Sequence, residues 1–194
     1  MKLFYFDLET TGTKFWKNGI HEISGIIEID GEIKEKFSFH VQPNPQAEIE
    51  QGALDVGGVT LEQINAYKPM GLVYLDIIKM LNKYVDKFDK KDKFYLVGYN
   101  NAPFDNAFFR AFFVQNNDNY FGSYFWSHSI DVMVLATCFL LKERSEMKDF
   151  KLKTVAEYLG IKIEEERLHL AAYDVEITRE IYLKWSNSTT LKKN

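Results

Sequence analysis

The chain has 194 residues, 46% of them hydrophobic, so it can bury a sizeable core, and we expect one domain over residues 1–187 with a polar tail at 188–194. A formal net charge of −4 argues against a protein that holds nucleic acid by a broad basic surface, but not against a narrow site that contacts a few phosphates. The single cysteine, Cys138, excludes an internal disulfide and is expected to be buried, and the absence of a long apolar run predicts a soluble cytoplasmic protein.

The N-terminal run MKLFYFDLETTGT predicts a strand that carries two acidic residues. Strand side chains alternate, so Asp7 and Glu9 share one face with Leu3 and Tyr5, while Phe4, Phe6 and Leu8 lie on the other. Because both faces are apolar, the strand belongs inside a covered sheet, where paired carboxylates are unfavourable unless a cation neutralises them. An Asp-x-Glu pair alone is common on solvated turns, so a metal site requires further carboxylates downstream.

Two strands and a helix are predicted next. Residues 20–30 and 31–42 are β-rich and are joined by Asp30-Gly31, which favours a tight hairpin and makes the two strands antiparallel neighbours. Residues 43–60 predict a loop with short helical turns, and Pro69 lies near the start of an amphipathic helix. The apolar residues at helical spacing in it are Leu72, Leu75, Ile78, Met80 and Leu81.

The second half of the chain alternates strands with helices. Residues 94–100 predict a buried strand, and an aromatic helix is expected from about Pro103 to Gln115. A short strand then leads into a helix that begins near Asp131, another helix ends at Gly160, and the last helix falls within residues 169–185. Three antiparallel strands followed by this alternation predict a mixed sheet flanked by helices, the α/β class.

Two further carboxylates lie in informative places. Asp105 lies at the junction between a predicted strand and a predicted helix, a position at which α/β folds place ligands. The alternative is that Asp105 is an N-terminal helix residue that interacts with the helix macrodipole. Asp174 comes five residues after His169, a rotation of about 500° on an ideal helix, so we expect His169 in the loop or first turn. The alternative for His169 is a surface or helix-capping residue.

Three segments together resemble a known family. They are Asp7-x-Glu9-Thr10-Thr11-Gly12, Asn101-x-x-Phe104-Asp105 and His169-x-Ala171-x-x-Asp174. Their order and spacing resemble the signature of the DEDD 3′–5′ exonucleases, the DnaQ-like family, in its histidine subtype. Asp131 and Thr178 also resemble family positions, whereas Asn100 and Pro103 depart from the usual second motif. The tyrosine subtype would place tyrosine where this chain has Leu170.

The resemblance implies an RNase H-like fold and a phosphodiester hydrolase that releases nucleoside 5′-monophosphates. Asp7, Glu9, Asp105 and Asp174 would hold two Mg²⁺ or Mn²⁺ ions, and His169 would act as the general base. The backbone around Thr10 and Thr11, together with Asn101 and Phe104, would bind the terminal nucleotide. Phe15 and Trp16 are candidates for stacking on a base, with core packing as the alternative.

Several questions stay open at this point. The substrate implied is the 3′ end of single-stranded DNA, but an exoribonuclease or oligoribonuclease-like enzyme fits equally, since nothing locates a contact to a 2′-hydroxyl. A non-catalytic nucleic-acid-binding module is the third reading, and it predicts a missing ligand or base. A polymerase is a candidate partner that would have to bind a surface patch, because the chain ends shortly after the last motif.

Overall fold

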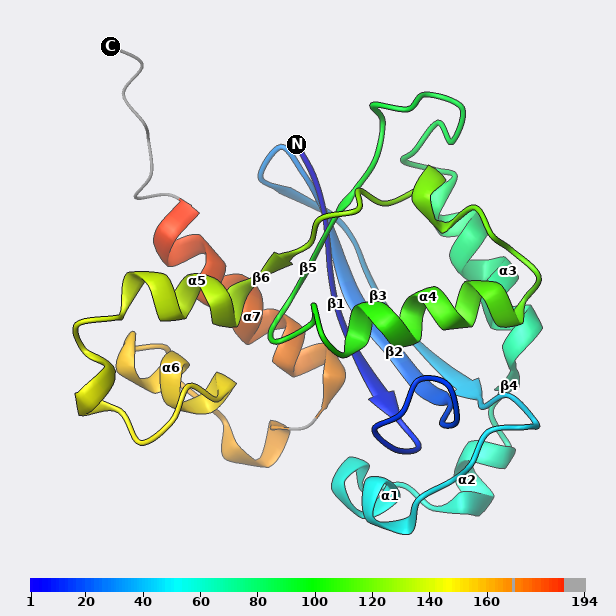
Figure 1. Cartoon of the computed structure of the whole chain (residues 1–194), viewed down its shortest axis with the longest axis horizontal. Coiled ribbons are helices and arrows are strands. Elements are labelled where there is room, and N and C mark those ends of the chain that lie inside the picture. The colour runs from blue at the N-terminus through cyan, green and yellow to red at the C-terminus, as the bar shows by residue number, and fades with distance from the viewer. Residues whose placement is uncertain (169, 187–194) are drawn as a thin grey trace.

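A six-stranded mixed sheet lies at the centre of the computed structural model, which describes residues 1–168 and 170–186 (Figure 1). Its strands are β1 (Lys2–Thr10), β2 (Ile20–Ile29), β3 (Glu32–Gln42), β4 (Lys68–Pro69), β5 (Tyr95–Gly98) and β6 (Ile130–Asp131), in the order β4-β3-β2-β1-β5-β6. The first three strands are antiparallel, and β5 and β6 continue the sheet in parallel with β1. The predicted α/β architecture is therefore confirmed.

The hairpin between β2 and β3 turns at the predicted dipeptide. Asp30 has φ 52° and Gly31 has φ 86°, the left-handed conformation that a two-residue hairpin turn requires at both central positions. This turn sets a register in which Glu22 pairs with His40 and Ser24 with Ser38. Strand β2 also pairs with β1, so its side chains lie next to the acidic residues of that strand.

The predicted alternation along β1 divides the core into two clusters on opposite faces of the sheet. On one face, Phe4, Phe6 and Leu8 pack with α3 (Met70–Leu81) and α4 (Asp105–Gln115). On the other, Leu3 and Tyr5 pack with α5 (Val132–Phe139), α6 (Leu152–Tyr158) and α7 (Ala171–Ser186). Figure 1 shows these two groups of helices on either side of the strands. Asp7 and Glu9 continue the α7 face.

The connections carry short elements that the sequence did not fully predict. The loop after β3 contains α1 (Gln51–Gly57), and it is followed by α2 (Leu61–Asn65), which begins with a capping box between Thr60 and Gln63, and by β4. Single 3-10 turns occur at Phe121–Ser123, Arg144–Glu146 and Glu165–Arg167. None of the described helices is long and apolar enough to cross a membrane.

The predicted buried face of α3 was wrong in part. Leu72 and Leu75 are 50% and 59% exposed, whereas Val73 and Ile77 are fully buried against the sheet together with Met80 and Leu81. Both sets have helical spacing, because apolar residues occur around much of this helix. The packing of the helix on β3 selects the stripe that starts at Val73.

The expectation that Cys138 is buried was also wrong, because its side chain is exposed. Helix α5 buries Val132 and Ala136, and Leu140 follows one turn later. Cys138 is two residues from Ala136, about 200° around the helix, and so lies on the outer side. The proposed tail falls in residues 187–194, outside the described part of the chain.

Candidate active site

The carboxylates of β1 lie at the end of the strand, on the face covered by α7. Both Asp7 and Glu9 are partly buried, opposite Ser24 and Glu22 of β2. Burial raises the pKa of Asp7 well above its usual range, and the carboxylates of Asp105, Glu9 and Asp174 raise it further. Burial, followed by the charges of Glu22, Asp174 and Asp105, raises the pKa of Glu9 to about 8. The four carboxylates predicted from three separate motifs thus share one electrostatic environment.

Asp105 is the first residue of α4 and is 5% exposed. Burial raises its pKa to about 7, although backbone hydrogen bonds from Asp105 itself and from Leu8 partly lower it. Leu8 lies between Asp7 and Glu9, and the pairing of β1 with β5 ends earlier, at Tyr5 and Val97. Beyond that point, the backbone of β1 meets the side chain of Asp105 instead of a strand, which holds this carboxylate beside the other two.

Asp131 supports the turn that delivers Asp105. Its Oδ1 accepts hydrogen bonds from the amides of Asn100 at 3.0 Å and Met133 at 3.0 Å, and its Oδ2 accepts one from Ala102 at 3.3 Å. One carboxylate therefore caps α5 and fixes the β5–α4 turn, where Asn100 adopts φ 58°. This turn occupies residues up to Phe104, and α4 starts at Asp105, two residues after the predicted Pro103.

Asp174 enters the site from the first turn of α7, where it is partly buried. Ala171 at the start of the helix is fully buried, whereas Ala172 is exposed. Thr178, one turn beyond Asp174, is buried as well. His169, the predicted general base, lies outside the residues that the structure describes.

The two threonines after β1 are engaged in holding their own loop. Thr10 Oγ1 donates to the carbonyl of Gly12 at 2.8 Å. Thr11 is fully buried, and its hydroxyl donates to the carbonyl of Glu48 at 2.8 Å and accepts from the amide of Gly19 at 2.9 Å. Gly12 is required here, because a Cβ at this position would lie 2.4 Å from Asn18 Nδ2. The motif shapes the end of β1, and its contact with a nucleotide stays a prediction.

The remaining predicted substrate residues occupy different environments. Asn101 is fully buried, and its Nδ2 donates to Asn106 Oδ1 at 3.2 Å, while its Oδ1 has no partner among the described residues. Phe104 is partly buried, with its ring 5.0 Å from that of Phe108. The structure places Phe104 directly beside Asp105, whereas Asn101 braces the turn from inside.

Glu22 and His21, which the motifs did not indicate, line the same end of the sheet. Glu22 lies opposite Glu9, and its Oε1 accepts from Ser24 Oγ at 2.7 Å and from Ser38 Oγ at 3.2 Å. His21 is 1% exposed, neither ring nitrogen has a partner among the described residues, and burial lowers its pKa to about 4. The pairing of β1 with β2 places Glu22 beside Glu9, and no local pattern in the sequence indicates this register.

The donor set fits hard divalent cations. Asp7, Glu9, Asp105 and Asp174 offer only carboxylate oxygens, which Mg²⁺ and Mn²⁺ prefer over the nitrogen and sulfur ligands typical of zinc. Within residues 1–168 and 170–186, no three Asp, Glu, His or Cys side chains lie close enough together to coordinate one metal ion. Burial and mutual repulsion favour the protonated form of these carboxylates, and a bound cation would remove that bias.

Comparison with known families identifies one that spans nearly the whole chain. The family model described as "Exonuclease" (RNase_T) matches residues 4–182. A curated relative, the PolC-type DNA polymerase III of Clostridium perfringens, is 29% identical over 181 residues, which are 93% of this chain but 11% of the polymerase. The chain therefore spans only a small part of this relative.

Solved structures share the fold. E. coli exonuclease I in complex with a dT13 oligonucleotide superimposes with a TM-score of 0.73 at 20% identity, over 94% of this chain and 41% of that protein. The zinc-bound form of the E. coli exonuclease I complex with single-stranded DNA gives a TM-score of 0.75 at 20% identity, over 97% of this chain and 41% of that protein. These matches confirm the RNase H-like arrangement of antiparallel and parallel strands flanked by helices.

Proposed function

The chain belongs to the exonuclease family, and we propose that it is a 3′–5′ exonuclease that releases nucleoside 5′-monophosphates from single-stranded DNA. One observation carries the proposal: carboxylates from β1, α4 and α7, far apart in sequence, raise the pKa of Asp7 together with its burial. Buried, clustered carboxylates destabilise the folded state, and a role in phosphodiester hydrolysis would explain why the chain brings them together. The structurally similar exonuclease I holds single-stranded DNA, which supports DNA as the substrate.

In the proposed reaction, water attacks the phosphorus of the terminal phosphodiester, and the bond from this phosphorus to the 3′ oxygen of the preceding nucleotide breaks. The terminal nucleotide is released as a 5′-monophosphate, and the shortened strand keeps a 3′-hydroxyl. Divalent cations held by Asp7, Glu9, Asp105 and Asp174 would supply charge stabilisation at the phosphate and at the attacking and leaving oxygens. His169 would accept the proton of the water, a task that suits an imidazole of ordinary pKa. Phe104, next to Asp105, would pack against the terminal nucleotide, while Asp131 keeps the turn that carries both residues in place.

The buried His21 beside the carboxylate cluster would not compete with a metal ion for the carboxylates. His21 is fully buried beside α1, where a Cβ on Gly57 would lie 3.4 Å from its Nε2 and 3.7 Å from Glu9 Oε2. A neutral imidazole at this place does not compete for the carboxylates as a cation would. Glu9 therefore has no competing positive charge from His21 and would be available to a metal ion.

Association with a polymerase is a further part of the proposal. The curated relative is named as a PolC-type DNA polymerase III, and such a partner would make this domain a proofreading activity. Co-purification of the chain with the replicative polymerase of its own source organism, and increased misincorporation after Asp7→Asn, would support this role. Normal fidelity with the variant would argue for a stand-alone nuclease.

The test uses 5′-labelled single-stranded DNA and RNA of equal sequence, with Mg²⁺, with Mn²⁺ and with EDTA. Stepwise shortening from the 3′ end, with release of 5′-monophosphates only when metal is present, supports the proposal. Asp7→Asn and Asp174→Asn are the matched inactive controls against a contaminating nuclease. Faster shortening of RNA would move the substrate to the RNA alternative, and no shortening of either strand would overturn the proposed activity.

A further inference from the structure

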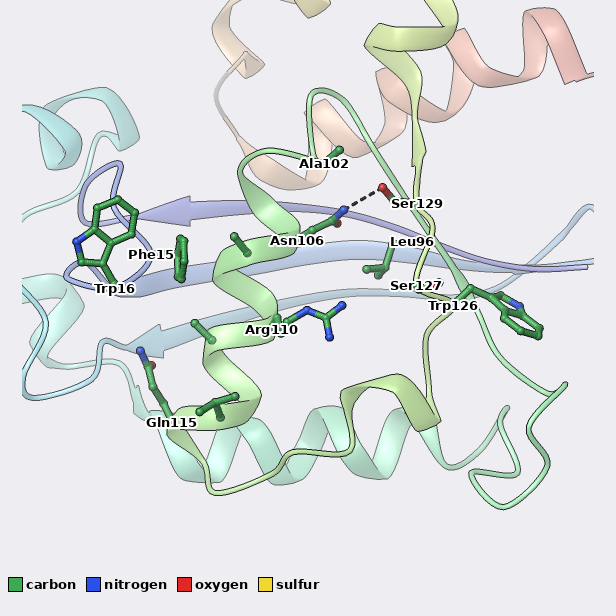
Figure 2. Close-up of a pocket in the computed structure, with 13 residues that line it drawn as sticks. Phe15, Trp16, Leu96, Ala102, Asn106, Arg110, Gln115, Trp126, Ser127 and Ser129 are labelled. Carbon is green, nitrogen blue, oxygen red and sulfur yellow. Dashed lines mark hydrogen bonds between the residues drawn. The ribbon is translucent and has the colours of Figure 1, made fainter.

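A groove of about 600 Å³ crosses the outward face of α4 (Figure 2). Its floor includes Ala107 and Ala111, which lie one turn apart on the side of the helix opposite its buried phenylalanines. These phenylalanines, at positions 108, 109, 112 and 113, hold α4 against the sheet. The small alanines on the other side leave the space open.

Aromatic side chains form both walls of the groove. Figure 2 shows Phe15 and Trp16 on one side of α4 and Trp126 on the other. Trp16 is 68% exposed, and its ring lies 5.1 Å from that of Phe15, edge to face. Trp126 is stacked on Tyr95 at 5.9 Å. Phe15 and Trp16 present exposed rings on one side of the open groove, and the partly buried Trp126 lines the other side. Such rings are suited to stacking on flat ligands, because every nucleobase offers a π-face.

The charge of the groove is the reverse of that of the whole chain. None of its lining residues is acidic, although the chain carries a net charge of −4. Arg110 lies on the groove-lining face of α4, and its guanidinium lies 4.5 Å from the centre of the Phe121 ring. Among the residues that the structure describes, no carboxylate forms an ion pair with Arg110. Lys93 lies behind the groove lining, where its ammonium is 5.4 Å from the ring centre of Trp126 and donates to the carbonyl of Gly122.

The groove begins where the candidate active site ends. Its upper end is lined by Ala102 and Asn106, and Asn106 Nδ2 donates to Ser129 Oγ at 2.9 Å (Figure 2). Asn106 directly follows Asp105, so the first residue of α4 faces the carboxylate cluster and the next faces the groove. The groove is therefore close enough to Asp105 to receive the part of a strand that precedes a phosphodiester bound there.

We propose that this groove binds the nucleotides that precede the 3′ end of a single strand, with bases stacked on Trp16 and Trp126 and a phosphate held by Arg110. The proposal rests on the proposed exonuclease function and extends it by defining the path of the strand away from the site. Aromatic walls, the Arg110 guanidinium with no carboxylate partner among the described residues, and the lack of acidic lining favour a polyanion over an apolar protein segment.

The test measures binding of fluorescein-labelled dT12, rU12 and dT3 by anisotropy in EDTA, so that hydrolysis does not interfere. We expect dT12 to bind more tightly than dT3, and Trp126→Ala to raise the Kd for dT12 roughly 5- to 100-fold, the contribution of one stacked base. Arg110→Gln should raise the same Kd and reduce the slope of log Kd against log salt by about 0.7, the value for one phosphate contact on a single strand. Phe88→Ala, an 85% exposed ring outside the groove, is the control and should change neither quantity.

Arg110 is exposed on its helix, so Arg110→Gln tests the groove even if Trp126→Ala were to unfold. A loss of affinity for dT12, for rU12 or for both supports binding in the groove and identifies which sugar the groove accepts. Unchanged affinities and salt slopes for both strands in Arg110→Gln would overturn the proposal and leave a protein segment as the occupant. Hydrolysis is measured separately with Mg²⁺. If the wild type is active and the variants bind DNA with unaltered affinity, the groove proposal alone is refuted. If the wild type is inactive and the variants bind DNA more weakly, the nuclease proposal alone is refuted.

Discussion

The amide nitrogen of Asn100 lies 3.0 Å from Oδ1 of Asp131, which couples the cap of α5 to the turn that carries Asp105. Two parallel strands meet here, because Gly98 of β5 pairs with Asp131 of β6. The Asn100 backbone is left-handed at φ 58°, a conformation that asparagine adopts more readily than most residues other than glycine. The carboxylate of Asp131 holds the turn that carries Asp105 by accepting hydrogen bonds from the amides of Asn100 and Ala102.

Asp131→Ala should lower both stability and activity. Loss of the cap costs about 1–2 kcal/mol, and the released turn should displace Asp105 and reduce kcat about 10-fold or more. The matched control is Asp149→Ala, which removes hydrogen bonds to the Lys151 amide and the Thr154 hydroxyl away from the site. Denaturant unfolding and kcat are measured for both. Equal kcat in the two variants would show that Asp131 does not position Asp105.

Asp7→Asn should abolish most of the activity while the fold persists or becomes more stable. The substitution removes the cost of ionising Asp7 among neighbouring carboxylates. At a pH where the cluster is ionised, relief of about 1 kcal/mol would raise the thermal midpoint of the metal-free protein by roughly 2–4 °C. Asp105→Asn and Asp174→Asn should likewise lose activity. Hydrolysis near the wild-type rate in any of the three would rule out the ligand set.

The metal-free protein should lose stability as the pH rises from about 5 to about 8. The folded pKa values of Glu9, about 8, and Asp105, about 7, lie above their ordinary values, so the native state holds protons that the unfolded chain has released in this range. Each such proton changes the free energy of unfolding by about 1.4 kcal/mol per pH unit. Glu9→Gln should flatten the profile measured in EDTA, whereas Glu180→Gln, exposed on α7, should not. A flat wild-type profile would contradict the raised pKa values.

Mn²⁺ should raise the thermal midpoint of the wild type. An ion that binds only the folded carboxylate cluster stabilises by about 2.7 kcal/mol at a concentration one hundred times its Kd. The same titration with Asp7→Asn should give a much smaller shift, and Ca²⁺ or Zn²⁺ series would rank the preference of the site. Melting that is indifferent to millimolar Mn²⁺, together with no heat of binding in calorimetry, would refute the metal site.

His169→Ala should lower kcat roughly 10²- to 10⁴-fold while Mn²⁺ binding stays nearly intact, if the imidazole is the general base. The wild-type rate should fall as the pH drops through the pKa of this histidine in the complex, and that limb should be absent from the variant. His128→Ala, an exposed histidine, serves as the control. A structural His169 would alter stability and leave the pH profile of kcat unchanged.

Local patterns in the sequence determined a large part of the fold and of the carboxylate cluster. The period-two alternation of β1 correctly separated Phe4 from Tyr5 and placed Asp7 on the α7 face, because a strand has only two faces. Asp30-Gly31 predicted its hairpin because few residues other than glycine, asparagine and aspartate adopt positive φ readily. The resemblance of the three motifs to the exonuclease family implied which acids belong together. In the structure Asp105, Glu9 and Asp174 all raise the pKa of Asp7, and their role as metal ligands stays a prediction.

Only the tertiary structure decided which side chains from distant elements meet. Leu72 and Val73 both fit a helical stripe, and only packing against the sheet selects Val73 for burial. The proximity of Glu22 to Glu9 follows from the register between β1 and β2, which no local pattern encodes. Asp131 binds the Asn100 turn across two strands, and the groove on α4 needs walls from residues 15–16 and from Trp126, more than a hundred positions apart. Periodicity and turn chemistry act within a few residues, whereas these sites arise from contacts that form only when the whole sheet and its helices are assembled.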